Sequence, residues 1–404
     1  MAAMPLRVLH VVPYFEAAWA YGGIPRVVGP LTHALADRGL EVTVCTTDVG
    51  DRHSRWRPGP PDGLDVRVFP NLSNTAAYHL QLFLPRGMSA WLRRRAGSFD
   101  LAHLHGCHHL PGAHAAAALR EAGVPWILTP HGTAPYRDRQ RLAKRVFAST
   151  VGRRVLPEAA AVIAVSEAER RTLERFGVAA ERIRVLPNPM PVDELVAPPR
   201  GRFRHRLGLG DGPVVLFLGQ LTAQKRVDVV LDAVARLDDG VRLVVAGNDM
   251  GAGSALRRRA RRLGLDARAA FPGLLRGPER LEALADADVV AYPSRGEVFG
   301  LVPLEALLCG TPVVVADDGG CGEMVSRVGG GRMVRIDDAV DDAGSLADAL
   351  AAVLGDPEAA RRAARDAAAR LRRLVDVRTV ARATEELYAS VLDGRPGRRL
   401  AEAA

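Results

Sequence analysis

At 404 residues the chain is longer than one hydrophobic core usually supports, so we expect two domains. The composition, with 48% hydrophobic and 25% charged residues, is typical of a soluble globular protein and argues against a disordered one. The formal net charge of +9 favours anionic partners, but it does not choose among nucleic acid, anionic lipid and a phosphorylated ligand.

The densest basic run, 257–262, lies on an expected helix with no aromatic residues between the arginines. We interpret it as a solvated helix face, so no nucleic-acid partner is expected. No apolar stretch reaches the roughly 18 to 20 residues that span a bilayer, and the start of the chain lacks the apolar segment of a signal peptide. We therefore expect a cytoplasmic protein whose contact with a membrane would be peripheral, at its inner face. The cysteines show no CxxC spacing, which is typical of a reducing compartment.

Short β-branched stretches alternate with helices rich in alanine, leucine and arginine along the whole chain. This alternation predicts an α/β fold with parallel sheets covered by helices on both faces. In the first half the expected strands are 7–13, 41–47, 64–70, 101–106, 125–132, 161–166 and 183–188. Ser166 and Glu169 form a capping box that starts the helix after the sixth of these strands.

The stretch 187–203 is rich in proline, which excludes a continuous helix or a central strand, and we interpret it as a linker. The strand pattern then resumes at 213–219, 241–247, 269–273, 289–294 and 312–317. We predict two Rossmann-like domains, 1–195 and 196–374, facing each other across a cleft. The helix 375–392 is expected to pack back on the first domain, and the tail 393–404 to be loose. Ligands of such sheets bind beyond the carboxyl ends of the strands, so function is sought at the turns from strand to helix.

The most informative stretch is 296–312, GEVFGLVPLEALLCGTP, which follows an expected buried strand. Gly300 and Pro303 mark the start of a helix. A helix N-terminus carries about half a positive charge and unpaired N–H groups, and it therefore suits phosphate. Glu297 lies in the loop and Glu305 in what we expect to be the first turn of the helix. Taken singly, each is more simply a solvated loop residue or a carboxylate that balances the helix dipole.

Together with its neighbours, this stretch resembles the Glu-x7-Glu signature of glycosyltransferase family 4, whose members are retaining enzymes with the GT-B architecture of two Rossmann-like domains. The order of elements is similar to that family over nearly the whole chain. The resemblance implies a nucleotide-sugar donor, with Glu305 at its ribose and Glu297 at its sugar. It also implies that the backbone N–H groups of Phe299, Gly300 and Leu301 face the diphosphate and the sugar.

The stretch 217–233, FLGQLTAQKRVDVVLDA, resembles the second donor motif of the family, in which two basic residues lie five positions apart. Lys225 stands at the second position, but Gln220 stands at the first. This departure leaves the diphosphate one positive charge short, and Arg226 is the candidate to supply it. A chain this rich in arginine that keeps lysine at 225 favours a compact ammonium there.

The first domain contributes three further candidates for the donor site. Gly22 and Gly23, in AYGGIPRVV (20–28), precede a helix start, and in the family this pair lies against the phosphate side of the donor. Alone, the pair is no more than a turn. His131 ends a strand in LTPHGTAPY (128–136), where the family has a histidine that reaches the donor sugar. No GxGxxG follows the first strand, which argues against a dinucleotide-dependent dehydrogenase.

A metal ion or other cofactor is not expected. The stretch 102–114, AHLHGCHHLPGAH, is rich in histidine, and strand alternation would place His103 and His105 on one face. However, no carboxylate or second cysteine completes a zinc set at standard spacing. Asp286 and Asp288 imitate the metal-binding DxD motif of other glycosyltransferases, but they fall at a helix end and read as a charge pair.

The resemblance therefore implies an enzyme, a metal-independent hexosyltransferase acting with retention in polysaccharide, glycolipid or glycoconjugate biosynthesis. Its expected catalytic residues are His131, Lys225 and Glu297, and stabilisation of the leaving phosphate would be their main contribution. Two alternatives stay open: a nucleotide-sugar epimerase of similar fold, and a non-catalytic subunit that binds nucleotide sugar.

The acceptor is expected to be a sugar, a lipid-linked molecule or another small molecule. The loop 13–23 carries Tyr14, Phe15, Trp19 and Tyr21, which suit either stacking on an acceptor or packing as a lid. Basic segments at 93–95 and 141–145 would suit an anionic membrane.

Overall fold

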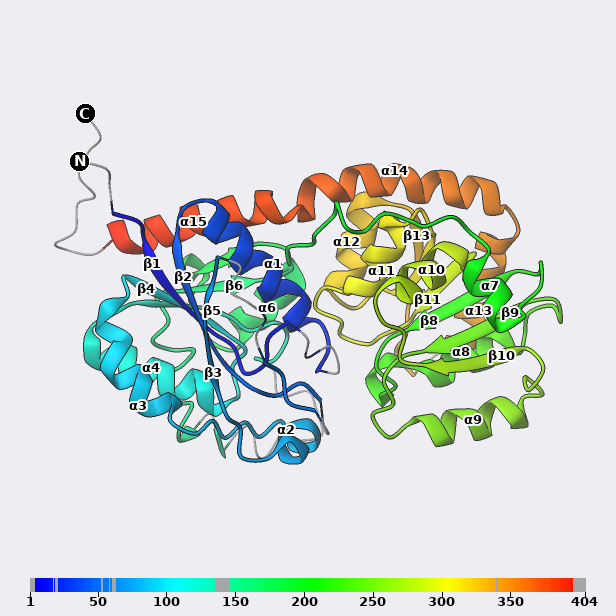
Figure 1. Ribbon diagram of the computed structural model, residues 1–404. Coiled ribbons are helices and arrows are strands. Elements are labelled where there is room, and N and C mark those ends of the chain that lie inside the picture. The colour runs from blue at the N-terminus through cyan, green and yellow to red at the C-terminus, as the bar shows by residue number, and fades with distance from the viewer. Residues whose placement is uncertain are drawn as a thin grey trace. The chain divides into compact units, whose positions relative to one another are not determined.

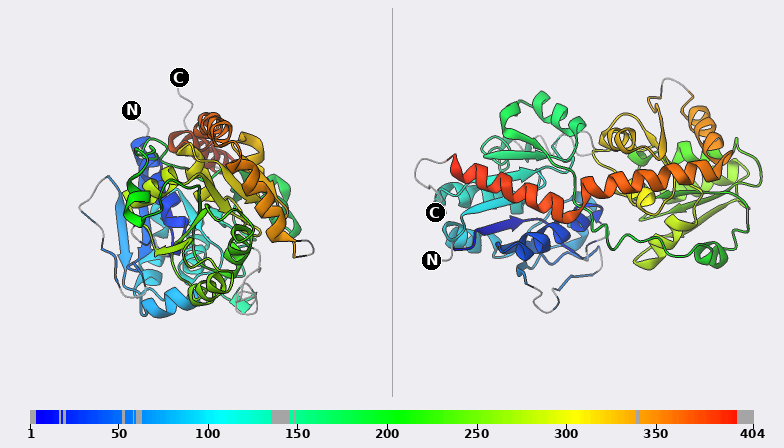
Figure 2. Two further views of the ribbon diagram at one scale, coloured as in Figure 1. Left: turned by 90° about the vertical axis from the view of Figure 1, so that its right-hand side faces the viewer. Right: turned by 90° about the horizontal axis from the view of Figure 1, so that it is seen from above.

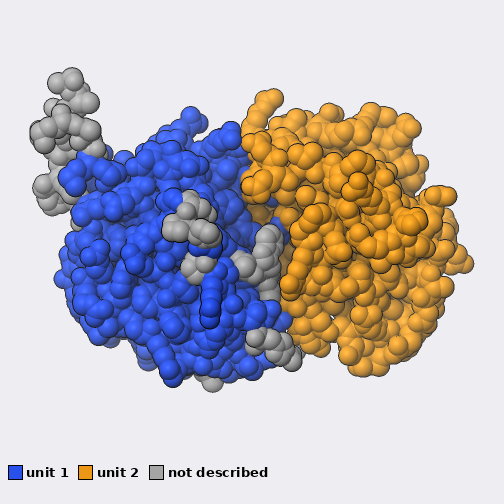
Figure 3. Space-filling model, in the orientation of Figure 1, with its two compact units in different colours: residues 1–190, 376–404 blue, residues 191–375 orange. Residues whose placement is uncertain are grey.

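The computed structural model describes residues 4–16, 18, 21–51, 54–57, 59, 63–134, 146–147, 149–338 and 341–394. The chain forms two compact units, one of residues 1–190 with 376–404 and one of residues 191–375 (Figure 3). The first boundary falls within the proline-rich stretch 187–203. The second returns the last helix of the chain to unit 1.

Unit 1 is built on a sheet of seven parallel strands in the order β3-β2-β1-β4-β5-β6-β7. The strands are β1 (Arg7–Val11), β2 (Glu41–Thr47), β3 (Asp65–Phe69), β4 (Leu101–His105), β5 (Trp126–Thr129), β6 (Ala161–Ala164) and β7 (Ile183–Val185). The order reverses between β1 and β4, where His10 and His103 are neighbours in register. The carboxyl ends of these two strands are therefore the place where such a sheet binds ligands.

Helices cover both faces of this sheet, as Figure 1 shows. They are α1 (Ile24–Asp37), α2 (Asn74–Leu80), α3 (Met88–Arg95), α4 (Leu110–Ala122), α6 (Glu167–Arg175) and α15 (Val377–Asp393). One half of the expected capping box is present, because Ser166 Oγ accepts a hydrogen bond from Glu169 N at 3.2 Å, while Glu169 Oε2 accepts from Val165 N at 2.8 Å. Asp376 starts α15 in a similar way, with its carboxylate accepting from the amides of Arg378 and Thr379.

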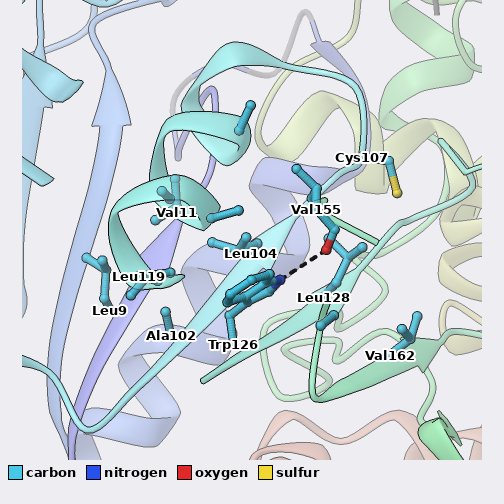
Figure 4. Close-up of a cluster of buried hydrophobic side chains, with 14 of the residues drawn as sticks. Leu9, Val11, Ala102, Leu104, Cys107, Leu119, Trp126, Leu128, Val155 and Val162 are labelled. Carbon is cyan, nitrogen blue, oxygen red and sulfur yellow. Dashed lines mark hydrogen bonds between the residues drawn. The ribbon is translucent and has the colours of Figure 1, made fainter. Parts of the chain in front are cut away.

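Alternate residues of the central strands enter two different cores. Leu9 and Leu104 point to the side of α3 and α4, where Figure 4 shows Trp126 donating to the carbonyl oxygen of Val155 at 3.0 Å. Val8 and Leu101 point to the other side, toward α1 and α15. The period-two pattern of the strands thus decides which helices each side chain meets.

The last helix, α15, completes the second of these cores. It packs against α1 and buries a stripe of side chains that includes Ala381, Leu387, Tyr388 and Leu392. Tyr388 has no exposed surface. Figure 2 shows α14 and α15, in orange and red, as the last two helices of the chain.

Unit 2 has a six-stranded sheet, also parallel, in the order β10-β9-β8-β11-β12-β13. Its strands are β8 (Val214–Leu218), β9 (Arg242–Ala246), β10 (Ala269–Gly273), β11 (Val289–Tyr292), β12 (Val313–Ala316) and β13 (Gly331–Val334). The sequence did not predict β13, because it is a short, largely exposed edge strand that starts at a glycine and follows two more.

The helices of unit 2 are α7 (Arg202–Leu207), α8 (Val227–Val234), α9 (Gly253–Arg262), α10 (Pro278–Asp286), α11 (Leu301–Leu308), α12 (Gly320–Val328), α13 (Asp342–Leu354) and α14 (Pro357–Val375). Asp286, at the end of α10, accepts hydrogen bonds from the amides of Phe203 and Arg204 at the start of α7. Asp288 forms ion pairs with Arg204 and Arg361. The DxD-like pair is therefore engaged with arginines and with the start of a helix.

Several other sequence expectations can be compared with the structure. Tyr14 and Phe15 are buried core residues and do not offer stacking surface, while Trp19 and the segment 141–145 lie outside the described residues, as does the tail from 395. The four cysteines are free and buried. In the described part of the chain, no helix combines the length and the apolar character needed to cross a membrane.

Candidate active site

The site in unit 2 lies where the strand order of its sheet reverses. The order changes direction between β8 and β11, and the carboxyl end of such a pair of strands is where α/β sheets bind ligands. Lys225 lies in the turn after β8, and Glu297 in the loop after β11. Two motifs that are 72 residues apart in the sequence are thereby brought into contact.

The two side chains form an ion pair supported by two hydroxyl groups. Lys225 Nζ contacts Glu297 Oε2 and donates to the hydroxyl oxygen of Tyr292 at 2.8 Å. The same carboxylate oxygen accepts from Tyr292 at 3.1 Å and from Ser294 Oγ at 3.0 Å. Lys225 also lies 5.0 Å from the centre of the Tyr292 ring, within the range of a cation–π contact. Tyr292 and Ser294 were not singled out from the sequence, although they end the strand that leads into the Glu-x7-Glu motif.

Both members of the pair are held in their charged forms. Burial acts to raise the pKa of Glu297, but the charge of Lys225 and three side-chain hydrogen bonds outweigh it and leave this pKa lowered. Burial likewise acts to lower the pKa of Lys225, but the Glu297 carboxylate outweighs it and leaves that pKa raised. The ammonium is therefore charged at neutral pH, with one carboxylate as its anionic partner.

The loop that carries Glu297 leaves no room for side chains at two of its contacts. Gly300 has φ +76°, and a Cβ atom there would lie 2.5 Å from Cys321 Sγ. A Cβ atom on Gly319 would lie 2.4 Å from the carbonyl oxygen of Glu297. The glycines thus let the loop lie directly against the start of α12, where Cys321 N donates to the Glu297 carbonyl oxygen at 3.3 Å.

The start of α11 offers backbone donors for an anion. Gly300 is the residue before the helix and provides no side-chain cap for the amides of the first turn, which starts at Leu301. The Phe299 side chain is buried, so only its backbone can face a ligand. These positions suit the diphosphate contacts that the resemblance implies.

Glu305 was expected in the first turn of α11, but it lies in the second turn. The helix begins at Leu301, two residues before Pro303, because Gly300 in its left-handed conformation starts it earlier. The Glu305 side chain is 3% exposed and forms an ion pair with Arg280 of α10. Burial lowers the pKa of Arg280. No sequence motif marked Arg280, because the helix that carries it is recognised only by the spacing of its apolar residues.

Gln220 and Arg226, the other two candidates from the second donor motif, have different surroundings. Gln220 follows β8 in a turn where Gly219 and Gly247 approach closely, since a Cβ atom on Gly247 would meet the Gly219 carbonyl oxygen. The Arg226 guanidinium faces carboxylates, at 2.9 Å from Asp338 and 3.2 Å from Asp342. Its positive charge is thus already balanced within unit 2.

Three of the expected donor residues belong to unit 1. Gly22 has φ +106°, and Gly23 is the residue before α1. His131 follows β5 with φ +51°, and the next amide, Gly132 N, donates to the buried carboxylate of Glu169 at 2.6 Å. Burial lowers the pKa of His131 to about 4, although a hydrogen bond to the Asn188 side chain acts to raise it.

A cluster of buried histidines in unit 1 contains possible metal ligands. His10, His103 and His105 each offer one ring nitrogen, and these three nitrogens lie within 4.8 Å of one another. His103 and His105 share one face of β4, as strand alternation predicts. All six ring nitrogens already have hydrogen-bond partners, so a metal ion would have to displace existing contacts.

Comparison of the sequence with known proteins identifies a family to which the chain is similar. Residues 22–189 match the "Glycosyl transferase 4-like domain" and residues 200–370 match "Glycosyl transferases group 1". A D-inositol 3-phosphate glycosyltransferase of Xylanimonas cellulosilytica is 33% identical over 93% of this chain and 94% of its own length. A protein of the same name from Nocardia farcinica is 33% identical over 81% of this chain and 76% of its own.

The chain belongs to glycosyltransferase family 4. Its fold agrees, since Anabaena HepE in complex with UDP-glucose superimposes with a TM-score of 0.74 at 22% identity, covering 95% of this chain and 100% of that one. The sucrose-phosphate synthase of Thermosynechococcus elongatus does so with a TM-score of 0.76 at 23% identity, covering 96% and 100%. The glycosyltransferase is therefore a GT-B enzyme with two parallel-sheet α/β domains, and neither the epimerase nor the non-catalytic subunit is favoured.

Proposed function

We propose that this glycosyltransferase transfers a hexose from a uridine diphosphate donor to a hydroxyl group, without a metal ion and with retention of anomeric configuration. The observation that carries the proposal is the Lys225–Glu297 pair beside the start of α11, at the switch point of the unit 2 sheet. Support for uridine comes from Anabaena HepE, whose solved complexes contain UDP and UDP-glucose.

The chemistry requires stabilisation of the leaving diphosphate. As the glycosidic bond stretches, negative charge develops on the β-phosphate and positive charge on the sugar ring. Lys225 supplies a compact ammonium, and the amides at the start of α11 supply oriented dipoles. Donor binding gives the ammonium a second anionic partner, the diphosphate. The ammonium then neutralises the charge that a divalent cation neutralises in enzymes with a DxD motif.

Glu297 and His131 orient the sugar in this proposal. The Glu297 carboxylate is ionised and held by hydrogen bonds from Tyr292 and Ser294, so it presents a fixed negative charge. Such a charge favours the positive sugar ring of the transition state. Glu305 then receives the ribose hydroxyls, with Gly22, Gly23, Gln220 and Arg226 at the periphery of the donor.

For the acceptor we propose a hydroxyl on a small phosphorylated polyol. The relatives named D-inositol 3-phosphate glycosyltransferases support this class, and the net charge of +9 suits an anionic acceptor.

A second candidate is a lipid-linked acceptor, reached by peripheral contact of a cytoplasmic enzyme with an anionic membrane. Arg93, Arg94 and Arg95 are exposed at the end of α3, and Leu80 and Leu82 are 58% and 41% exposed. Co-sedimentation with anionic liposomes at low salt decides between the two, since only the lipid-linked acceptor requires it.

The donor site is tested by calorimetric titration of the full chain with UDP, GDP, ADP and dTDP, each with and without EDTA. We expect UDP to bind most tightly, with no effect of EDTA, and Lys225→Ala to slow turnover about 10²- to 10³-fold. Lys225→Arg is the matched control, since it keeps the charge but not the compact ammonium. Turnover of Lys225→Ala within threefold of wild type would remove Lys225 from the mechanism. No binding of any nucleotide would overturn the proposal.

A further inference from the structure

Six side chains of unit 1 form one continuous chain of hydrogen bonds that ends at His131. Thr129 Oγ1 lies 2.7 Å from His103 Nε2, and His103 Nδ1 lies 2.7 Å from the Tyr388 hydroxyl. Tyr388 lies 3.3 Å from His10 Nε2, and His10 Nδ1 lies 3.0 Å from His105 Nε2. Finally, His105 Nδ1 lies 3.2 Å from His131 Nε2.

The chain joins parts of the sequence that are far apart. Its members come from β1, β4, β5, the turn after β5, and α15, and the residue from α15 is 285 positions from its histidine partner. His10 and Tyr388 have no exposed surface, and His103 and His105 are each 1% exposed. Water therefore does not replace these partners, and each contact needs one proton from within the chain.

Counting protons shows that the histidine tautomers are coupled. A neutral imidazole has one N–H group and one accepting nitrogen. Burial lowers the pKa of His10 to about 3, and it lowers those of His103 and His105 as well, which keeps the rings neutral. Each interior member of the chain must then donate on one side and accept on the other. The chain as a whole has only two arrangements, with all protons pointing toward His131 or all pointing away from it.

Thr129 distinguishes the two arrangements. If the protons point away from His131, Thr129 accepts from His103 and its own buried hydroxyl proton needs another acceptor. Within the described residues, the hydrogen bonds of the Thr129 side chain comprise only the one with His103. If the protons point toward His131, Thr129 donates and its proton is satisfied. A buried donor left unsatisfied loses its hydrogen bond to water without a replacement, which favours the second arrangement.

We propose that Thr129 and Tyr388 are positioning residues that hold His131 as the neutral tautomer with its proton on Nδ1. His131 Nε2 accepts from His105, so the single proton of the neutral ring stands on Nδ1. The inference rests on the proposed function for the role of His131 at the sugar, but the tautomer itself can be measured without a substrate.

Two observations outside the chain agree with this assignment. The hydrogen bond between His131 and the Asn188 side chain raises the His131 pKa, as it does when the histidine is the donor and the amide oxygen accepts. In addition, Glu169 accepts from Gly132 N at 2.6 Å and so holds the backbone turn on which His131 sits. Backbone and ring are thus fixed by separate contacts.

The test uses the full-length protein labelled with ¹⁵N-histidine and correlation spectra that distinguish Nδ1–H from Nε2–H tautomers. We expect His131 to carry its proton on Nδ1 at pH 7. Thr129→Val removes the terminal donor with little change in shape, and Tyr388→Phe breaks the chain at its centre. Both variants should give a mixture of His131 tautomers, while Thr129→Ser should keep the wild-type tautomer.

An Nε2–H tautomer in the wild type would overturn the inference, as would an unchanged His131 tautomer in both Thr129→Val and Tyr388→Phe. Binding of stoichiometric zinc with loss of the His10 and His103 N–H signals would also overturn it, because the cluster would then be a metal site.

Kinetics separates this inference from the proposed function. We expect Thr129→Val to lower kcat about tenfold, as for the loss of one well-placed hydrogen bond, with an unchanged affinity for UDP and recovery in Thr129→Ser. Equal kcat values for Thr129→Val and Thr129→Ser would contradict a positioning role. If the wild type bound no nucleotide while the tautomers behaved as expected, the proposed function would fail and the tautomer assignment would stand.

Discussion

The ion pair between Glu305 and Arg280 predicts that Glu305→Ala destabilises the enzyme in addition to any effect on the donor. The two side chains are 3% and 14% exposed, so the substitution leaves a buried guanidinium without its carboxylate. Arg280 Nε already lacks a hydrogen-bond partner among the described residues. Replacement contacts for the freed guanidinium are therefore scarce.

The magnitude follows from the cost of leaving one charge of a buried pair alone. Breaking such a pair costs about 3–5 kcal/mol. In a domain of about 150–250 residues, each kcal/mol lowers the melting temperature by about 2–4 °C. We therefore expect Glu305→Ala to lower the transition of unit 2 by about 6–20 °C.

The assay exploits the distribution of tryptophan. All four tryptophans precede residue 127, in the stretch that forms unit 1, so their fluorescence does not report on unit 2 directly. The loss of stability should appear in far-UV circular dichroism at a temperature where the tryptophan signal is still native. Glu279→Ala, at an exposed position in the first turn of α10, is the matched control and should change stability by less than about 0.5 kcal/mol. A melting curve for Glu305→Ala that coincides with that of this control would refute the reasoning.

Two further predictions concern the loop before α11 and the carboxylate behind His131. Gly300→Ala should weaken UDP binding at least tenfold by calorimetry, because the added methyl group meets Cys321. Gly264 also has a positive φ but no neighbour within 4 Å, so Gly264→Ala should leave the affinity for UDP unchanged. Equal affinities in the two variants would show that the clash is absent. Burial raises the pKa of Glu169 from 4.5 to about 7, so the stability from this group is complete below pH 4.5 and is lost as the pH rises through 7. Wild type should therefore lose about 2–3 kcal/mol more than Glu169→Gln between pH 5 and pH 8 in urea unfolding followed by tryptophan fluorescence, and equal losses would contradict the raised pKa.

The sequence predicted the parts of the fold that follow from local periodicity. Buried strands such as 41–47 are short runs rich in β-branched residues, and the structure places β2 at Glu41–Thr47. The edge strand β13 was missed because three of its four residues are exposed and glycines precede it, so it lacks that signal. The start of α11 was misplaced because Pro303 is typical of a first turn, while the left-handed Gly300 sets the actual boundary.

The candidate site was predicted only as far as its motifs extend. Lys225 and Glu297 could be named from the sequence, and their contact follows from the parallel order of β8 and β11. Arg280 could not be named, because a residue that pairs across two helices leaves no spacing signal in one sequence. Similarly, strand alternation placed His103 and His105 on one face, but their link to Tyr388 depends on the packing of a helix nearly 300 residues later.

The order of synthesis gives the last helix a particular importance for folding in the cell. Unit 2 is continuous in sequence, whereas the core of unit 1 needs residues that the ribosome adds only after unit 2. At about 5–20 residues per second, roughly 10 to 40 s pass between completion of residue 190 and the appearance of α15. During that interval His10 and His103 lack the Tyr388 hydroxyl, and the apolar surface that α15 will cover is open. The first domain thus stays incomplete until unit 2 has been made, and a chain cut short before α15 would lack part of the core of the domain that was made first.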